Sequence, residues 1–107
     1  MSKLKILSKD YEVSYKRMPT KDGKLWWGKT DHKTAQITIN TDASKQQQLD
    51  TLLHEAIHVV DAELDLRLTE AKVRGLAVGL CSMVLENPGI FRLRKTARTI
   101  RAERRKK

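Results

Sequence analysis

Two histidines and a glutamate stand at a spacing that suits metal chemistry. His54 and His58 are four residues apart, and Glu55 directly follows the first of them. On a helix, side chains four residues apart project from the same face, so both imidazoles can reach one ion. Zinc in hydrolytic sites takes three protein ligands and leaves a fourth position for water, whose pKa it lowers to about 7. Glu55 lies about 100° around the helix from His54, where its carboxylate could take a proton from that water.

A third metal ligand must come from another segment, and Glu70 is the first candidate. It follows a turn after Leu64 and opens a second predicted helix, so a helical hairpin would return it toward His54 and His58. The alternative is that Glu70 only favours the positive end of a helix dipole. Asp61, three residues beyond His58, competes with it, but helical reach places Asp61 better to accept a hydrogen bond from a ligand histidine.

The segments before this motif predict a small sheet. Residues 11–15 alternate between apolar and polar side chains, and residues 35–40 do the same, which is the period of half-buried strands. Asp22 and Gly23 signal a turn between the two runs. We therefore expect an α+β fold in which a small antiparallel sheet packs on the helix that carries the motif.

Apolar periodicity predicts that helix over residues 45–63, opened by Ser44 as its cap. When each residue is advanced by about 100°, the two histidines and Glu55 fall outside one arc that holds the apolar side chains: Leu49, Leu52, Leu53, Ala56, Ile57, Val60 and Leu64. The site should therefore face away from the packed side of the helix.

A second helix should follow, and a third segment after it. Thr69 is a good cap for the second helix, and Asn87, Pro88 and Gly89 should end it. Apolar residues at helical spacing from Ile90 to Ile100 predict a third, basic C-terminal helix.

The charge of the chain is concentrated in that last segment. Of the net charge of +9 on 107 residues, almost all lies in residues 91–107, which carry nine basic side chains against one acidic. We expect one domain over residues 1–90, with residues 91–107 as a basic tail whose first part belongs to it. No signal peptide or membrane span is evident, so we expect a cytoplasmic protein without membrane contact. The single cysteine, Cys81, should be a buried, inert thiol.

The motif resembles that of the gluzincin zinc peptidases, and most closely that of the small ImmA/IrrE-like and SprT-like metallopeptidases of bacteria and phages. The similarity covers roughly residues 28–88. It implies one zinc ion per chain, bound by His54, His58 and Glu70, with Glu55 as general base. It also implies that the strand before the active helix forms the cleft edge and pairs with an extended peptide substrate through Gln36, Ile37, Thr38 and Ile39. The chain is short for these families, and no motif marks an oxyanion-stabilising residue, for which Tyr11, Tyr15, His32 and Arg67 remain open.

A protein of another class is the main alternative. In that interpretation zinc, or no metal at all, holds the helices of a regulatory protein together, and the basic tail contacts nucleic acid without base specificity. The tail could equally be a solvated helix end or a contact for an acidic protein partner. The favoured prediction is a metallopeptidase that acts on a peptide or protein substrate.

Overall fold

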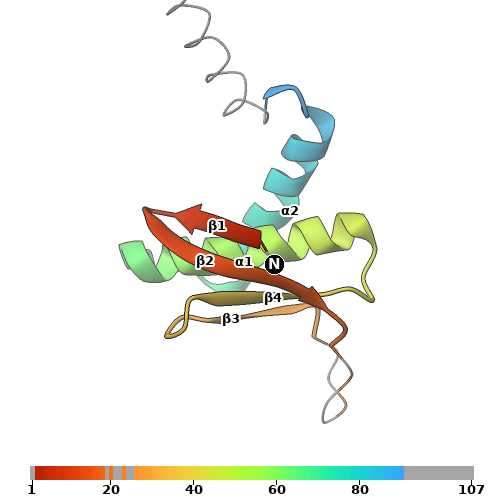
Figure 1. Ribbon diagram of the computed structural model, residues 1–107. Helices are drawn as coiled ribbons and strands as arrows, with labels where there is room; N and C mark the ends of the chain where they lie inside the picture. Colours follow the sequence, from red (N-terminus) through yellow and green to blue (C-terminus); the bar gives the residue numbers. More distant parts are fainter. Residues whose placement is uncertain (1, 19, 21–22, 24–25, 91–107) are drawn as a thin grey trace, which may run out of the picture.

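The computed structural model describes residues 2–18, 20, 23 and 26–90. Four strands precede two helices: β1 (Ser2–Ile6), β2 (Lys9–Lys16), β3 (Gly28–Asp31), β4 (Gln36–Asn40), α1 (Lys45–Leu64) and α2 (Glu70–Glu86) (Figure 1). The predicted basic C-terminal helix lies outside the described residues. Within the described part of the chain, no helix combines the length and the apolar character that crossing a membrane requires.

The four strands form one mixed sheet in the order β1-β2-β4-β3. The pairs β1–β2 and β3–β4 are antiparallel, but β2 and β4 are parallel, with Val13 opposite Ile37. The prediction of a purely antiparallel sheet is therefore wrong in this detail, although the α+β class is confirmed. The reason is that β3 reverses the chain between β2 and β4, so that β4 runs in the same direction as β2.

Helix α1 lies across one face of this sheet, and the core lies between them (Figure 1). Buried side chains of three strands and of α1 form the core cluster: Ile6, Tyr11, Val13, Ile37, Ile39 and Val59. Fully burying an aliphatic or aromatic side chain contributes roughly 1.5–3 kcal/mol, so these few contacts hold α1 firmly against the sheet. The position of the motif helix is thereby fixed relative to the strands.

The buried face of α1 is not the one that the apolar arc predicts. Its buried residues are Gln48, Thr51, Glu55 and Val59. Leu52, Ala56 and Val60 of the predicted arc pack only partly against the core, and Leu64 is exposed. Thr51 and Glu55 can be buried because they lie against the small residues Gly28 and Thr30 of β3. Glu55 therefore lies on the packed side of the helix rather than away from it.

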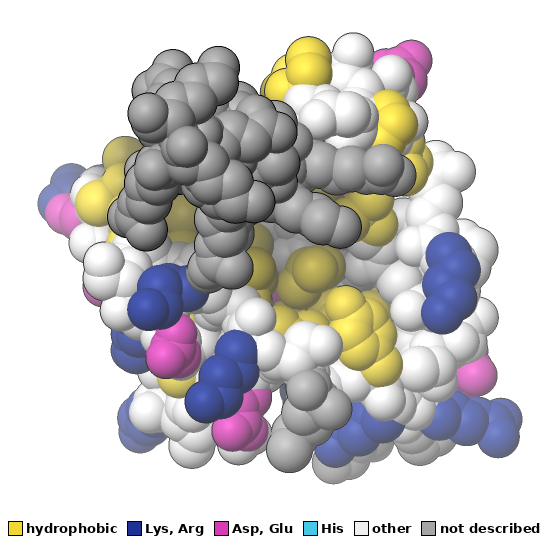
Figure 2. All heavy atoms as spheres, turned by 45° about the horizontal axis from the view of Figure 1, so that its top comes forward, with side chains coloured by type: hydrophobic (Ala, Val, Ile, Leu, Met, Phe, Trp, Pro, Cys, Tyr) yellow, Lys and Arg dark blue, Asp and Glu magenta, His cyan; other side chains and the backbone are white. Residues whose placement is uncertain are grey.

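Each helix begins at the cap that the sequence predicts. Ser44 accepts a hydrogen bond from the Gln47 amide at 3.1 Å, and Thr69 accepts one from the Lys72 amide at 3.2 Å. Helix α2 packs on α1 through Val73, Ala77 and Cys81. Other apolar side chains of α2 are exposed: Leu76, Val78, Leu80, Met83 and Leu85. Figure 2 shows hydrophobic side chains at the surface on one face of the molecule.

The side chain of Asn40 links the chain segments that connect the strands at one end of the sheet. Its fully buried side chain accepts hydrogen bonds from the amides of Met18 and Asp42 and donates to the carbonyls of Met18 and Trp26. These four bonds use the full capacity of one amide side chain. Asn40 therefore fixes both the chain that enters β3 and the chain that leaves β4 for α1.

Candidate metal centre

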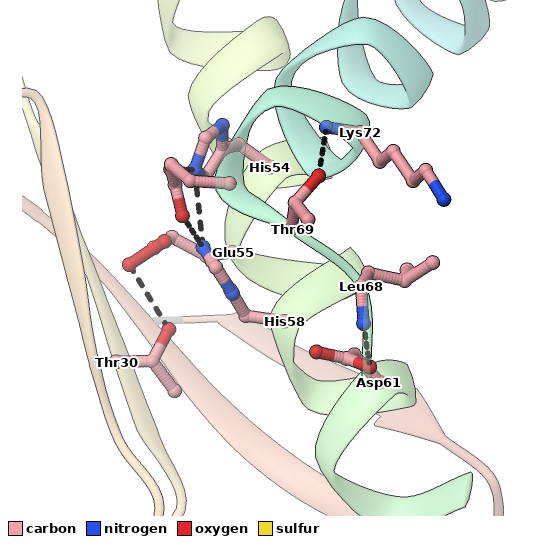
Figure 3. A network of polar contacts seen from close by, with 9 residues as sticks. Thr30, His54, Glu55, His58, Asp61, Leu68, Thr69 and Lys72 are labelled. Carbon is pink, nitrogen blue, oxygen red and sulfur yellow. Dashed lines mark hydrogen bonds and ion pairs between the residues drawn. The ribbon is translucent and has the colours of Figure 1, made fainter. Parts of the chain in front are cut away.

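The two motif histidines lie on the flank of α1 that faces the start of α2. Their Nε2 atoms are 3.2 Å apart, and their ring centroids are 4.9 Å apart. The side chains of His54 and His58 are 24% and 32% exposed, so both can be reached from solvent. Figure 3 shows both rings turned toward the first turn of α2. Two nitrogen donors thus meet at one point beside that turn.

Glu70 places a carboxylate at the same point. Its Oε1 lies 2.7 Å from His54 Nε2, and its Oε2 lies 3.1 Å from His58 Nε2. Four-coordinate zinc holds such ligands at roughly 2.0–2.2 Å, which separates two ligand atoms by about 3.3 Å in a tetrahedral site. The observed separations need to widen only slightly to admit an ion, so these three side chains fit a zinc site.

The loop between the helices determines where Glu70 lies. Asp61 Oδ1 accepts a hydrogen bond from the Leu68 amide at 3.1 Å, and the Asp61 carbonyl accepts one from the Leu66 amide at 3.1 Å. Asp65 turns the chain at a φ of 51°. Asp61 thus shapes the hairpin, and among the described residues no hydrogen bond joins its carboxylate to either histidine. Through these two bonds Asp61 holds the loop that carries Glu70.

Glu55 occupies a different place from the three converging side chains. Its side chain points toward the sheet, where Oε1 accepts a hydrogen bond from the Thr30 hydroxyl at 3.2 Å (Figure 3). The residue is only 9% exposed. Its carboxylate still lies close to the two imidazoles, because donor atoms of His54, Glu55 and His58 fall within 4.8 Å of one another and could hold a metal ion together. Both carboxylates are therefore candidates for a third ligand: Glu70 contacts both imidazoles, and Glu55 lies beside them while hydrogen-bonded to β3.

The edge of the sheet beside this site is β3, not β4. Strand β4 has β2 on one side and β3 on the other, so Gln36, Ile37, Thr38 and Ile39 cannot form the substrate-binding edge that the resemblance implies. Strand β3 takes that position because the hairpin places it outside β4.

Gly28 allows this edge strand to approach α1 closely. A Cβ at Gly28 would lie 2.5 Å from Thr51 Cγ2 and 3.0 Å from the Thr38 carbonyl oxygen. Any larger residue would push the strand and the helix apart. Thr30 faces the same side of β3 two residues later, so the close approach at Gly28 brings the Thr30 hydroxyl within reach of Glu55.

A cleft of about 680 Å³ opens between β3 and the two helices. Its walls carry the metal-ligand candidates and Glu55 together with Thr30, Lys29 and Arg74. The half-exposed rings of Trp26 and Trp27 line one part of it. Arg74 follows Glu70 by one helical turn and therefore shares its face of α2.

The residues left open for oxyanion stabilisation lie in different places. His32 lines the cleft. Tyr11 is fully buried in the core, Tyr15 borders a separate hollow, and Arg67 lies beside Asp65 in the interhelical loop. Sequence reasoning missed Thr30, Gly28 and Arg74. Helical spacing from Glu70 could have identified Arg74, whereas the roles of Gly28 and Thr30 depend on a strand pairing that no local pattern marks.

Among the described residues, two ionisable groups outside the cluster of His54, His58 and Glu70 have shifted pKa values. Hydrogen bonding to the Thr34 amide lowers the pKa of Asp31, which closes the turn between β3 and β4. Burial raises the pKa of the Cys81 thiol, and the Asp50 carboxylate adds to that shift. Cys81 borders a second hollow of about 500 Å³ on the other side of Asp50. A neutral thiol is consistent with the predicted inert packing role.

Comparison with known proteins finds no relative of this chain. The resemblance to gluzincins therefore rests on the sequence motif alone. No family model, curated protein or solved structure matches this chain.

Proposed function

We propose that this protein is a zinc-dependent metallopeptidase. The observation that supports the proposal is the position of Glu55 apart from three converging side chains. His54, His58 and Glu70 meet within 2.7–3.2 Å of one another, while Glu55 stands apart on a strand-facing side. A purely structural metal site would not require a further, nearly buried carboxylate at the edge of the same cleft.

Zinc and Glu55 would perform different parts of the hydrolysis. When bound by His54, His58 and Glu70, zinc would supply a Lewis acid and lower the pKa of a coordinated water. Glu55 accepts a proton from the attacking water as the new carbon–oxygen bond forms. It then passes that proton to the amine nitrogen as the carbon–nitrogen bond breaks, which restores the Glu55 carboxylate.

Strand β3 offers the groups that would hold an extended substrate. The backbone N–H of Asn40 donates to the Trp27 carbonyl at 2.8 Å, so these two residues form a hydrogen-bonded pair of the antiparallel ladder. Such pairs alternate with pairs whose peptide groups point away from the partner strand. The peptide groups of Gly28 and Thr30 therefore face outward, where a peptide could add to the sheet edge.

Metal content and cleavage test the proposal together. Protein purified without chelators should contain one zinc ion per chain. Glu55→Gln should retain that zinc and lose proteolysis of an unfolded substrate such as casein. A protein that binds no zinc, or a Glu55→Gln variant as active as the parent, would contradict the proposal. If zinc is bound but neither protein cleaves any member of a broad peptide library, the non-catalytic regulatory alternative is favoured.

A further inference from the structure

Thr30 meets two parts of the site from one position on β3. Its hydroxyl donates to Glu55 Oε1 at 3.2 Å. Its peptide N–H and C=O belong to the outward-facing groups of the edge strand, as the ladder pattern from the Asn40–Trp27 bond indicates. One residue therefore touches the base with its side chain and faces the cleft with its backbone.

This hydrogen bond occupies one oxygen of the Glu55 carboxylate. A general base must keep an oxygen within about 2.6–3.2 Å of the proton that it takes, and a small displacement of a reacting group can cost about 100-fold in rate. A hydrogen bond to one oxygen restrains rotation of the carboxylate and leaves the other oxygen to accept the proton. The core contact of neighbouring Val59 and the close approach at Gly28 fix the helix and strand that carry the two partners.

We propose that Thr30 is a positioning residue that aligns Glu55 with the peptide bound along β3. The inference rests on the proposed function and adds a residue to its machinery. The hydroxyl that contacts Glu55 and the peptide groups that would bind the substrate belong to the same residue. Thr30 therefore determines the distance between the substrate backbone and the base. The side-chain hydroxyl is the essential group, so Ser should replace Thr, and the isosteric Val should not.

Three variants test this role. Thr30→Val removes the hydroxyl at nearly constant volume, and Thr30→Ser restores it. Thr38→Val is the matched control, because Thr38 is 8% exposed and lies on the neighbouring strand between Ile37 and Ile39, so its side chain is on the sheet face opposite the core. We expect Thr30→Val to keep its zinc content and its KM and to lose about 10- to 100-fold in kcat. Thr30→Ser should recover kcat to within a few-fold of the parent, and Thr38→Val should leave it unchanged.

Crystal structures of the metal-free variants supply a readout that requires neither zinc nor activity. The Glu55 carboxylate should keep its place in the parent and in Thr30→Ser, and move or become disordered in Thr30→Val. An unmoved carboxylate in Thr30→Val, an unchanged kcat, or a change in KM alone would overturn the positioning role. If the parent protein binds no zinc or cleaves no substrate, the proposed function is overturned instead. Failure of the positioning role can thus be distinguished from failure of the proposed function.

Discussion

Replacing Glu70 by Gln should remove most of the stability that zinc confers, and this is the most direct test of the ligand set. A ligand that binds only the folded state stabilises it by about 4.1 kcal/mol when its free concentration is 1,000 times its Kd. For a domain of about 100 residues, 1 kcal/mol raises Tm by about 4 °C at the lower end of the usual range, so zinc should raise the parent Tm by about 16 °C.

The structure sets the size of the loss. Glu70 contacts both histidines, and even groups that only orient metal ligands typically contribute 10- to 100-fold in affinity. A 100-fold weaker site at the same zinc concentration would confer about 1.4 kcal/mol, or about 6 °C. Because the Glu70 side chain is 54% exposed, the variant should match the parent to within about 0.5 kcal/mol when zinc is absent.

Asp61→Ala provides the contrast in the same assay. It removes the acceptor of the Leu68 amide, so it should cost about 1–2 kcal/mol with or without zinc. It should keep most of the zinc-induced shift. Differential scanning fluorimetry with and without excess zinc, after treatment with a chelator, measures all three proteins. If Glu70→Gln keeps the full shift and Asp61→Ala loses it, Asp61 is the ligand and the reasoning from the interhelical contacts is wrong.

Further predictions concern the scaffold around the site. Gly28→Ala should lower the free energy of unfolding in urea by about 1–3 kcal/mol, because the added Cβ would meet Thr51. Adding Thr51→Ser should recover part of this stability. An unchanged stability of Gly28→Ala would contradict the close approach of β3 and α1. Asn40→Ala should lower the free energy of unfolding by about 3 kcal/mol or more, since it leaves buried backbone groups without partners; a cost below 1 kcal/mol would show that water replaces them. The lowered pKa of Asp31 means that its carboxylate stabilises the fold above pH 3.8 and that this stabilisation disappears as the pH falls through the lowered pKa. Asp31→Asn should therefore be less stable at neutral pH and lose less stability on acidification, as urea titrations at several pH values would reveal. Cys81 should react slowly with iodoacetamide at pH 8 in the folded protein and rapidly in urea, because burial raises its pKa; equal rates would refute its burial.

Local signals determined how much of the fold the sequence could reveal. The two helices and their caps were predictable because Ser44 and Thr69 carry the capping signal themselves. Strand β1 was not predicted, since Leu7 and Ser8 make its turn at positive φ without the Asn-Gly signal of tight hairpins. Strand β3 turns only Gly28 and Thr30 toward the helix, so it lacks the apolar alternation that identifies a strand.

In the candidate site, too, the sequence predicts what depends on local signals and misses what depends on packing between distant segments. His54, Glu55, His58 and Glu70 follow from helical spacing and from a short hairpin, which are properties of one stretch of chain. The cleft edge depends on whether β3 or β4 lies outermost, and that order is decided by packing between segments far apart in sequence. Helical periodicity alone also misjudged the buried face of α1, because it counts apolar residues and cannot include the small ones that let Glu55 lie against a strand.

The mixed sheet order has a consequence for how the protein acquires its site during folding. The pairs β1–β2, β3–β4 and α1–α2 each join neighbours in sequence, whereas the parallel β2–β4 pairing and the docking of α1 join distant segments. Contacts between close neighbours form faster than distant ones, because less chain entropy is lost in closing the loop. The proposed zinc ligands all belong to the α1–α2 pair, so we expect a nascent helical hairpin to bind metal early. The proposed base, Glu55, and strand β3 would meet only in the last, slow assembly of the sheet. If the proposed function is right, a partly folded chain holds zinc before it is able to cleave its neighbours.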